Sequence, residues 1–283
     1  MLIQPVHSQD ATPKWLLNGL PKSGLHLISL MVATLANPPR NMPWYRPDWW
    51  GSLDNVWCTE FVGDADMRGQ FYKMARLQPG QYLRSHTAYR EDVADFVDKC
   101  GVSHVFIYRD PRDVAVSQAY HVISTDKSRE HHSKTFYRLI ERNHGFDDVL
   151  MAVIEGIGAY AGVMERWEMF APWLECERVC VVRFEEAINN LEAVAGHILL
   201  YGVNRINDAL ELNWQIDNNA FRRGIAEMVK TAKRTELSQT FRKGVSGEWR
   251  NEFKPEHVEA FKRCDVNGWL VKLGYEDNLD WGL

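Results

Sequence analysis

The stretch WLLNGLPKSGLHLISLMVATLA, residues 15–36, decides how the rest of the chain is interpreted. Residues 15–18 form a short apolar run, which ends in glycine and proline and predicts a buried strand followed by a turn. From residue 23 to residue 36 apolar side chains recur at helical spacing, which predicts a helix. Between them, the backbone N–H groups of residues 19–24 and the positive end of the helix can converge on an anion.

The same order of elements returns later in the chain. Residues 105–108 are rich in β-formers and precede Asp110-Pro111, after which residues 112–122 have a helical pattern. Residues 179–183 predict a third strand. Strands that alternate with helices favour a parallel sheet covered on both faces, so we expect an α/β fold, a P-loop-like three-layer sandwich with a central, mainly parallel sheet flanked by helices. Ligands of such sheets bind beyond the carboxyl ends of the strands.

Other stretches are expected to serve as scaffold or to line a pocket. The segment from residue 41 to residue 61 carries several tryptophans without a clean period and predicts an ordered loop region. With Tyr89 and Tyr120, its aromatic residues are candidates for the wall of an apolar pocket or for stacking on sugars, and core packing is the alternative. Three stretches look helical, namely 154–170, 191–200 and 256–273.

Length and composition restrict the class of protein. A chain of 283 residues with 45% apolar side chains predicts a single domain over residues 1–283. The formal net charge of −5 argues against nucleic acid or an anionic membrane as a partner. The five cysteines include no CxxC pair, and the N-terminus has no signal-peptide pattern. We therefore expect a cytoplasmic protein without a metal site, whose oligomeric state the sequence leaves open.

The loop at residues 19–24 differs from the phosphate loop of kinases. A Walker A loop requires a lysine and a hydroxyl residue directly after its second glycine, to bind phosphates and magnesium. Leu25 and His26 occupy those places, and the lysine lies inside the loop as Lys22. This disfavours an ATP-dependent phosphotransferase, although that enzyme remains the alternative, and favours metal-free transfer to or from a phosphate-bearing group. Taken alone, the motif is also compatible with a simple turn before a helix.

Residues 20–24, Leu-Pro-Lys-Ser-Gly, resemble the 5′-phosphosulfate loop of sulfotransferases that use 3′-phosphoadenosine 5′-phosphosulfate (PAPS), usually written PKSGTT. In that family two threonines follow the loop glycine, and a tryptophan then stacks on the adenine. His26 stands at a threonine position, and we hypothesise that it donates a hydrogen bond to a donor phosphate. The resemblance implies that the donor binds at Lys22, Ser23, Gly24, Leu25, His26 and Leu27.

Two further blocks resemble the same family. Residues 105–117, VFIYRDPRDVAVS, resemble its 3′-phosphate motif, which implies that Arg109 and Ser117 bind that phosphate. A planar guanidinium and a hydroxyl about two helical turns later suit one phosphate. Residues 241–251, FRKGVSGEWRN, resemble the RKGxxGxW segment that closes over the donor. The resemblance spans about residues 15–260 and adds Arg242, Lys243 and Gly244 to the expected donor contacts.

Residues 83–87, LRSHT, resemble the K[ST]H segment that carries the family's catalytic base. This implies that His86 takes the proton of an acceptor hydroxyl or amine, a role that suits a side chain with an ordinary pKa near ~6.5. Lys22 is expected to neutralise charge on the departing phosphate, and Ser117 to tether Lys22 when no acceptor is bound. Arg84 stands where the family has lysine.

The remaining expectations concern the adenine and the acceptor. Phe184 and Phe221 resemble the family's adenine-packing aromatics, and ordinary core packing is the alternative for each. The acceptor is expected to be a small molecule, with phenol, alcohol, carbohydrate and amine all open. A non-catalytic nucleotide-binding protein with this fold is a further alternative, because residues 25–27 depart from the family pattern.

Overall fold

The computed structural model describes residues 13–35, 71–124, 145–158, 160–213, 215–234 and 244–282, together with the backbone of residues 52–56. The chain divides into two compact units, which are described separately. The sheet unit consists of Met1–Gly19, Gly24–Tyr108 and Pro172–Phe241, and the helical unit of Leu20–Ser23, Arg109–Ala171 and Arg242–Leu283. That the whole chain acts as one domain stays a prediction.

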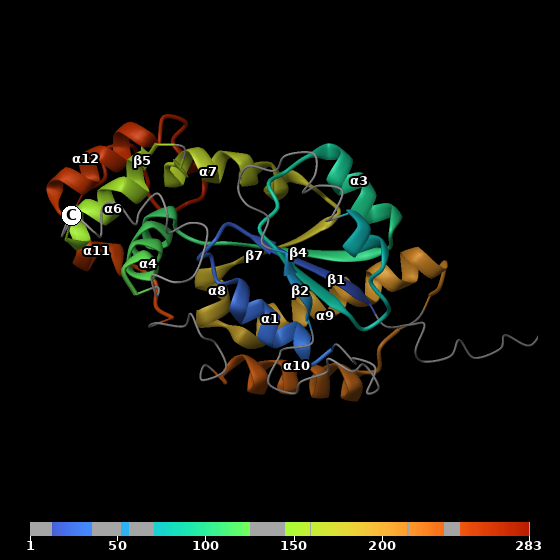
Figure 1. Cartoon of the computed structure of the whole chain (residues 1–283). Helices are drawn as coiled ribbons and strands as arrows, with labels where there is room; N and C mark the ends of the chain where they lie inside the picture. Colours follow the sequence, from blue (N-terminus) through green and yellow to red (C-terminus); the bar gives the residue numbers. More distant parts are fainter. Residues whose placement is uncertain are drawn as a thin grey trace, which may run out of the picture. The chain divides into compact units, whose positions relative to one another are not determined.

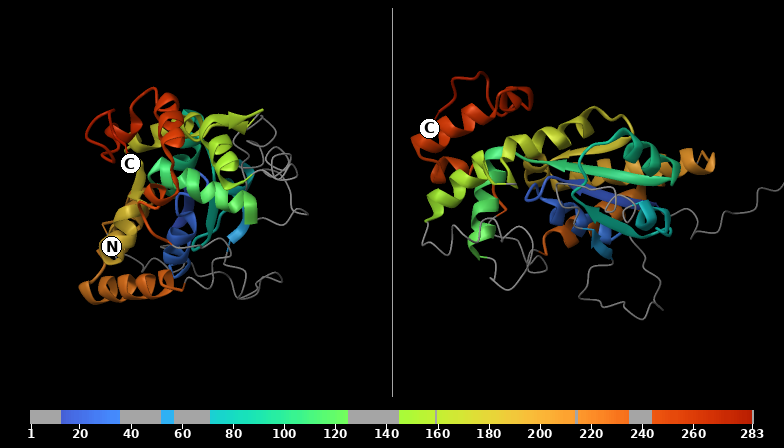
Figure 2. Two further views of the ribbon diagram at one scale, coloured as in Figure 1. Left: turned by 90° about the vertical axis from the view of Figure 1, so that its left-hand side faces the viewer. Right: turned by 45° about the horizontal axis from the view of Figure 1, so that its top comes forward.

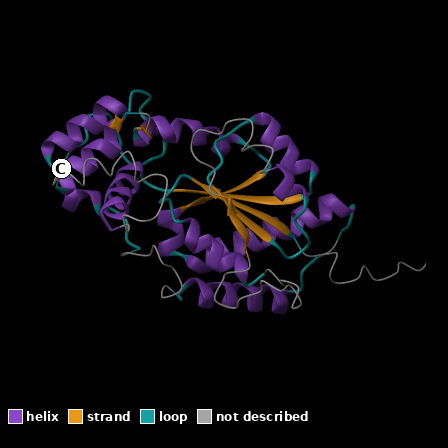
Figure 3. Cartoon of the chain, viewed as in Figure 1, coloured by secondary structure: helices purple, strands orange, loops and turns teal. Residues whose placement is uncertain are grey.

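A parallel sheet forms the centre of the sheet unit (Figure 3). Its five strands have the order β2-β3-β1-β4-β7, and each neighbouring pair is parallel. This confirms the predicted α/β class with a parallel sheet. The strands are β1 (Lys14–Gly19), β2 (Ser52–Val56), β3 (Tyr82–Ser85), β4 (Val102–Tyr108) and β7 (Val179–Arg183).

Helices cover both faces of this sheet, which makes three layers as expected. In Figure 1, α3 lies on one side of the strands, and α1, α8, α9 and α10 lie on the other. Helix α10 packs against α1 and α9, and Figure 2 shows it from two further sides. The helices are α1 (Leu25–Ala33), α3 (Glu91–Lys99), α8 (Phe184–Asn189), α9 (Leu191–Leu210) and α10 (Asn218–Ala232), with one more helical turn at residues 71–75.

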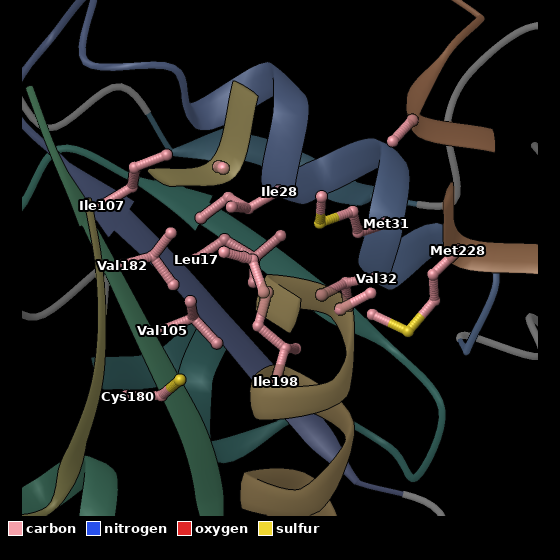
Figure 4. Packing of buried hydrophobic residues seen from close by; sticks show 14 of the residues in the cluster. Leu17, Ile28, Met31, Val32, Val105, Ile107, Cys180, Val182, Ile198 and Met228 are labelled. Atoms are coloured by element: carbon pink, nitrogen blue, oxygen red, sulfur yellow. The ribbon is translucent and has the colours of Figure 1, made fainter. Parts of the chain in front are cut away.

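A hydrophobic core lies between the sheet and the helices on its α1 side. It explains why the sequences of the strands are continuous apolar runs. Leu17, Val105 and Val182 come from three neighbouring strands and point towards Ile28 of α1 and Ile198 of α9 (Figure 4). All five side chains are at most 2% exposed. Since successive side chains of a strand alternate between faces and both faces are covered, both sets must be apolar.

A histidine is buried on the opposite face, within β4. Neither ring nitrogen of His104 has a hydrogen-bond partner among the described residues, and its ring packs edge-on against Trp173 at 4.5 Å between centroids. Complete burial lowers the pKa of His104 to about 3, because the imidazolium would lose its hydration. The folded protein therefore keeps this ring neutral.

This burial predicts a loss of stability in mild acid. Below pH 6.5, the ordinary pKa of histidine, His104 binds a proton in the unfolded chain but not in the folded protein. The free energy of unfolding therefore falls as the pH drops from 6.5 towards about 3. We expect His104 to remove about 2 kcal/mol of unfolding free energy between pH 7 and pH 5. Urea unfolding at both values should show this extra loss in the wild type and in the exposed control His197→Gln, but not in His104→Phe. An equal loss in His104→Phe would contradict this prediction.

The helical unit is built around α4 (Pro111–Ser124). Helices α6 and α7 pack against α4, and α12 packs against α6 (Figure 1). The other elements are α6 (Phe146–Glu155), β5 (Gly156–Ile157), β6 (Tyr160–Ala161), α7 (Val163–Phe170), α11 (Trp249–Glu252), α12 (Pro255–Cys264) and α13 (Trp269–Lys272). The 3₁₀ helix Ala171–Glu175 belongs to the sheet unit from Pro172 onwards. None of the helices in the described part of the chain is long and apolar enough to cross a membrane.

Two predicted helices are interrupted. The helix expected over residues 154–170 is wrong at its centre, where α6 ends and the β5–β6 hairpin precedes α7. Gly156 has a φ of 91°, and a Cβ there would lie 2.8 Å from the carbonyl oxygen of Tyr160, so the chain turns. The helix expected over 256–273 is interrupted between α12 and α13, where the carboxylate of Asp265 accepts from the backbone N–H groups of Trp269, at 2.7 Å, and Leu270, at 3.1 Å.

Two other boundaries differ from the sequence interpretation. Residues 52–56, expected within a loop region, form strand β2, while the rest of the segment 41–61 lies outside the described residues. The helix expected at 191–200 continues to Leu210 as α9. Residues 52–56 form a strand because they pair with β3, and the backbone hydrogen bonds of such a pair do not require a periodic side-chain pattern.

Candidate active site

The loop that joins β1 to α1 holds Lys22 in an unusual backbone conformation. Lys22 has a φ of 76°, and Glu211 is the only other described non-glycine residue with a positive φ. The N–H of Ser23 donates to the carbonyl oxygen of Leu20 at 3.1 Å, which closes the turn. A non-glycine residue in the left-handed region costs on the order of 1–3 kcal/mol, and such strain concentrates where chains bind ligands.

Ser23 supplies a buried hydroxyl to this loop. The residue is 1% exposed, and its Oγ has no hydrogen-bond partner among the described residues. Burying a hydroxyl without a partner costs about 1–3 kcal/mol, which a bound ligand can offset. Helix α1 follows directly, and its first turn contains no acidic residue to neutralise its positive end. These are the properties of an anion-binding loop.

Gly24 cannot be replaced by a larger residue without rearrangement. Its φ is 102°, and a Cβ there would lie 2.4 Å from Cδ2 of Phe184. Phe184 begins α8 and is 5% exposed, so it lines the core beside the start of α1. Phe221, on α10, is half-buried and packs against the same core. That these two aromatic rings contact an adenine stays a prediction.

His86 follows β3 and has a defined tautomer. Its Nδ1 lies 2.6 Å from the carbonyl oxygen of Gly19 at the end of β1. A carbonyl oxygen only accepts, so Nδ1 carries the proton and donates. A neutral His86 therefore has its lone pair on Nε2. This is the state in which a histidine can act as a general base.

Asn18 fixes the segment that carries His86, and sequence analysis missed it. Its Nδ2 donates to the carbonyl oxygen of Thr87 at 2.9 Å, and its Oδ1 accepts from the N–H groups of Thr87, at 2.8 Å, and Gly19, at 2.9 Å. Asn18 is fully buried. The signal in the sequence was a single polar residue within the apolar run 15–18. These three bonds tie Thr87, the residue after His86, to the end of β1 at Asn18 and Gly19.

His26 and Arg84 contact each other through their side chains. Nη1 of Arg84 lies 3.4 Å from Nδ1 of His26. A guanidinium only donates, so Nδ1 of His26 accepts and the proton of the neutral ring is on Nε2. Burial lowers the pKa of Arg84, and its Nε is buried without a hydrogen-bond partner in the described part of the chain. The pair thus presents His26 as an N–H donor.

Arg109 and the segment that starts at Gly244 meet within the helical unit. Nη2 of Arg109 donates to the carbonyl oxygen of Val245 at 2.8 Å and lies 3.3 Å from Oδ2 of Asp113. Ser117 is half-buried, two turns along α4. Gly244 is exposed, with a φ of 63°. The structure therefore brings the second and third sequence blocks together, while Arg242 and Lys243 lie outside the described residues.

The predicted site residues divide between the two units. Leu25 is 7% exposed and Leu27 packs against the core, so the side chains of both residues contribute to packing. Only their backbone N–H groups are suited to binding an anion. Among the described residues, no cluster of histidine, cysteine, aspartate and glutamate can hold a metal ion. Lys22, Ser23, Arg109, Ser117 and Gly244 belong to the helical unit, and Gly24, Leu25, His26, Leu27, His86, Phe184 and Phe221 to the sheet unit. Their roles stay predictions.

Comparisons with known proteins agree with the fold. The crystal structure of mouse sulfotransferase SULT7A1 complexed with PAP has a TM-score of 0.56 and 16% identity, covering 95% of this chain and 88% of that one. A retinol dehydratase in complex with retinol and PAP has a TM-score of 0.51 and 14% identity, covering 96% and 84%. No curated protein matches the sequence. Residues 12–265 match the family model of the sulfotransferase domain, and the chain therefore belongs to the sulfotransferase family of enzymes.

Proposed function

We propose that this enzyme transfers a sulfuryl group from PAPS to a hydroxyl or amine of a small-molecule acceptor. The observation that carries the proposal is the loop before α1, where Lys22 is strained and the buried Ser23 hydroxyl has no partner among the described residues. Two structures of similar fold contain PAP, the nucleotide that remains when PAPS has lost its sulfuryl group. They support PAPS as the donor.

The 5′-phosphosulfate of the donor would bind to the loop and to the start of α1. Backbone N–H groups at a helix start and the positive helix end favour such an anion. The Nε2–H of His26, which the contact with Arg84 favours, replaces the missing threonine hydroxyl as a donor. The full set of residues proposed for this end is Lys22, Ser23, Gly24, Leu25, His26 and Leu27.

The 3′-phosphate would bind in the helical unit. Arg109 offers a planar fork of N–H donors, and Ser117 a hydroxyl. Arg109 donates a hydrogen bond to Val245, the residue that directly follows Arg242, Lys243 and Gly244. We include those three residues as donor contacts, and Phe184 and Phe221 as the aromatic neighbours of the adenine.

His86 acts as the general base in the proposed mechanism. Its Nε2 takes the proton of the acceptor oxygen or nitrogen, while the hydrogen bond from Nδ1 to Gly19 holds the ring. The acceptor attacks sulfur as the bond from sulfur to the phosphate oxygen breaks, and Lys22 stabilises the charge on that oxygen. Ser117 tethers Lys22 before the acceptor binds. Cationic side chains and backbone dipoles suffice in this scheme, without a metal.

A small-molecule acceptor is supported by the retinol in one of the similar structures. The aromatic segment 41–61 proposed for the acceptor wall lies outside the described residues apart from the backbone of β2. Tyr89 packs edge-on against Trp173 at 4.9 Å, and Tyr120 donates to Glu252 at 2.8 Å. We propose the cytoplasm as the compartment, in line with the cysteine pattern of the sequence.

Ligand-dependent stabilisation tests the donor. We expect PAP at about 100 times its dissociation constant to raise the unfolding free energy by about 2.7 kcal/mol, and therefore to raise the melting temperature. Adenosine 5′-phosphate, which lacks the 3′-phosphate, should stabilise less, and ATP with magnesium should not exceed PAP. Greater stabilisation by ATP with magnesium would instead support a phosphotransferase. Stabilisation by PAP without sulfation of any acceptor would indicate a non-catalytic nucleotide-binding protein.

A further inference from the structure

Asp113, the third residue of α4, binds a segment more than a hundred residues away. Its Oδ2 accepts from the backbone N–H of Gly247 at 2.8 Å, and its Oδ1 accepts from that of Trp249 at 3.0 Å. The side chain of Asp113 is fully buried. A buried carboxylate that holds two backbone N–H groups makes charge-assisted hydrogen bonds, which are stronger than neutral ones.

Arg109 contacts both Asp113 and the segment that Asp113 binds. Its guanidinium lies 3.3 Å from the Asp113 carboxylate and donates to the carbonyl oxygen of Val245. Arg109, Asp113 and the segment Gly244–Trp249 are therefore mutually connected: the carboxylate orients the arginine, and both bind the segment. Because all three belong to the helical unit, this set of contacts lies within one compact body.

The segment Gly244–Trp249 depends on these contacts for its shape. It has no regular secondary structure before α11, and Gly244 and Gly247 both have positive φ values, of 63° and 79°. Backbone of this kind has many accessible conformations, and fixing one costs about 1–2 kcal/mol per residue. Trp249 is fully buried and anchors the far end. Asp113 therefore fixes the backbone of this segment at Gly247 and at Trp249.

We propose that Asp113 is a positioning residue that couples Arg109 to the segment after Arg242 and Lys243, so that a 3′-phosphate binds firmly only while this tether is intact. The inference rests on the proposed function, since the ligand is the 3′-phosphate of an adenosine nucleotide. It goes beyond that function, because Asp113 itself carries the wrong charge to contact a phosphate. Its effect must pass through Arg109 and the segment.

Nucleotide affinities of Asp113 variants test this coupling. Hydrogen bonds to a charged group contribute enough that Asp113→Ala should weaken PAP binding on the order of tenfold to a hundredfold. Binding of adenosine 5′-phosphate should change little, because that nucleotide has no 3′-phosphate. Asp113→Asn retains one acceptor oxygen and should fall between the wild type and Asp113→Ala. The control Glu165→Gln changes an exposed acid in the first turn of α7 and should bind PAP normally.

Isothermal titration calorimetry separates the possible outcomes. A folded Asp113→Asn variant with wild-type affinity for PAP, or with equal losses for both nucleotides, would overturn the inference and leave the proposed donor intact. A wild-type protein that fails to bind PAP, or binds it no better than adenosine 5′-phosphate, would overturn the proposed 3′-phosphate site and the inference with it. If Asp113→Ala does not fold, Asp113→Asn alone decides, because it keeps the size of the side chain.

Discussion

A His86→Ala variant is expected to lose turnover by about 10²–10⁴-fold and to bind PAP with unchanged affinity. A positioned general base contributes a factor of this size, and alanine removes Nε2 together with the whole ring. The proposed nucleotide contacts come from other residues, so donor binding should survive. The turnover of any acceptor that the wild-type protein sulfates, measured alongside calorimetry with PAP, separates the two effects.

Two variants make this result specific. His86→Gln retains an amide N–H that can donate to the Gly19 carbonyl oxygen but provides no base, so it should be as inactive as His86→Ala. His197→Gln changes an exposed histidine of α9 and should keep full turnover. Unchanged turnover in His86→Ala would remove this histidine from the mechanism and transfer the role of base to another group.

The strands were predictable because each is apolar on both faces. Residues 15–18, 105–108 and 179–183 stand out as short runs between turn residues, and all three lie within strands of the parallel sheet. The helix expected over 154–170 failed because side-chain periodicity continues across the glycines of the β5–β6 hairpin. Periodicity reports which side chains are apolar, whereas a positive φ at Gly156 depends on backbone contacts.

The candidate site was predictable only where a short motif carries it. Lys22, His86 and Arg109 lie in such motifs, and their chemistry follows from residue type and from a position after a strand. The residues that hold them were not predictable. Asn18 acts through the pairing of β1 with β3, and Asp113 contacts Gly247, 134 positions later in the sequence. Contacts between residues so far apart in the sequence arise from tertiary packing, and the spacing of residues within a short motif does not predict them.

Loss of the Arg112 side chain should strongly destabilise the protein. Arg112 is 1% exposed, its guanidinium donates to the Asp110 carboxylate at 2.8 Å, and it also pairs with Glu276. The same guanidinium lies 3.8 Å from the ring centroid of Trp249 and 4.8 Å from that of Trp281. Removing one partner of a buried ion pair costs about 3–5 kcal/mol, so we expect a loss of this size from Arg112→Met. Urea unfolding at pH 7 measures it.

The pH dependence of the unfolding free energy shows why Arg112→Met is destabilised. Burial raises the pKa of Asp110, and Arg112 opposes that rise by hydrogen bonding and charge. Without Arg112, the pKa of Asp110 in the folded state should rise further above its value in the unfolded state. The variant's deficit relative to the wild type should therefore be smallest in acid and grow as the pH rises through the raised pKa. Adding Asp110→Asn should recover part of the loss, whereas the exposed control Arg90→Ala should cost no more than about 1 kcal/mol. A deficit that is independent of pH and unaffected by Asp110→Asn would attribute the loss to the aromatic stacking instead.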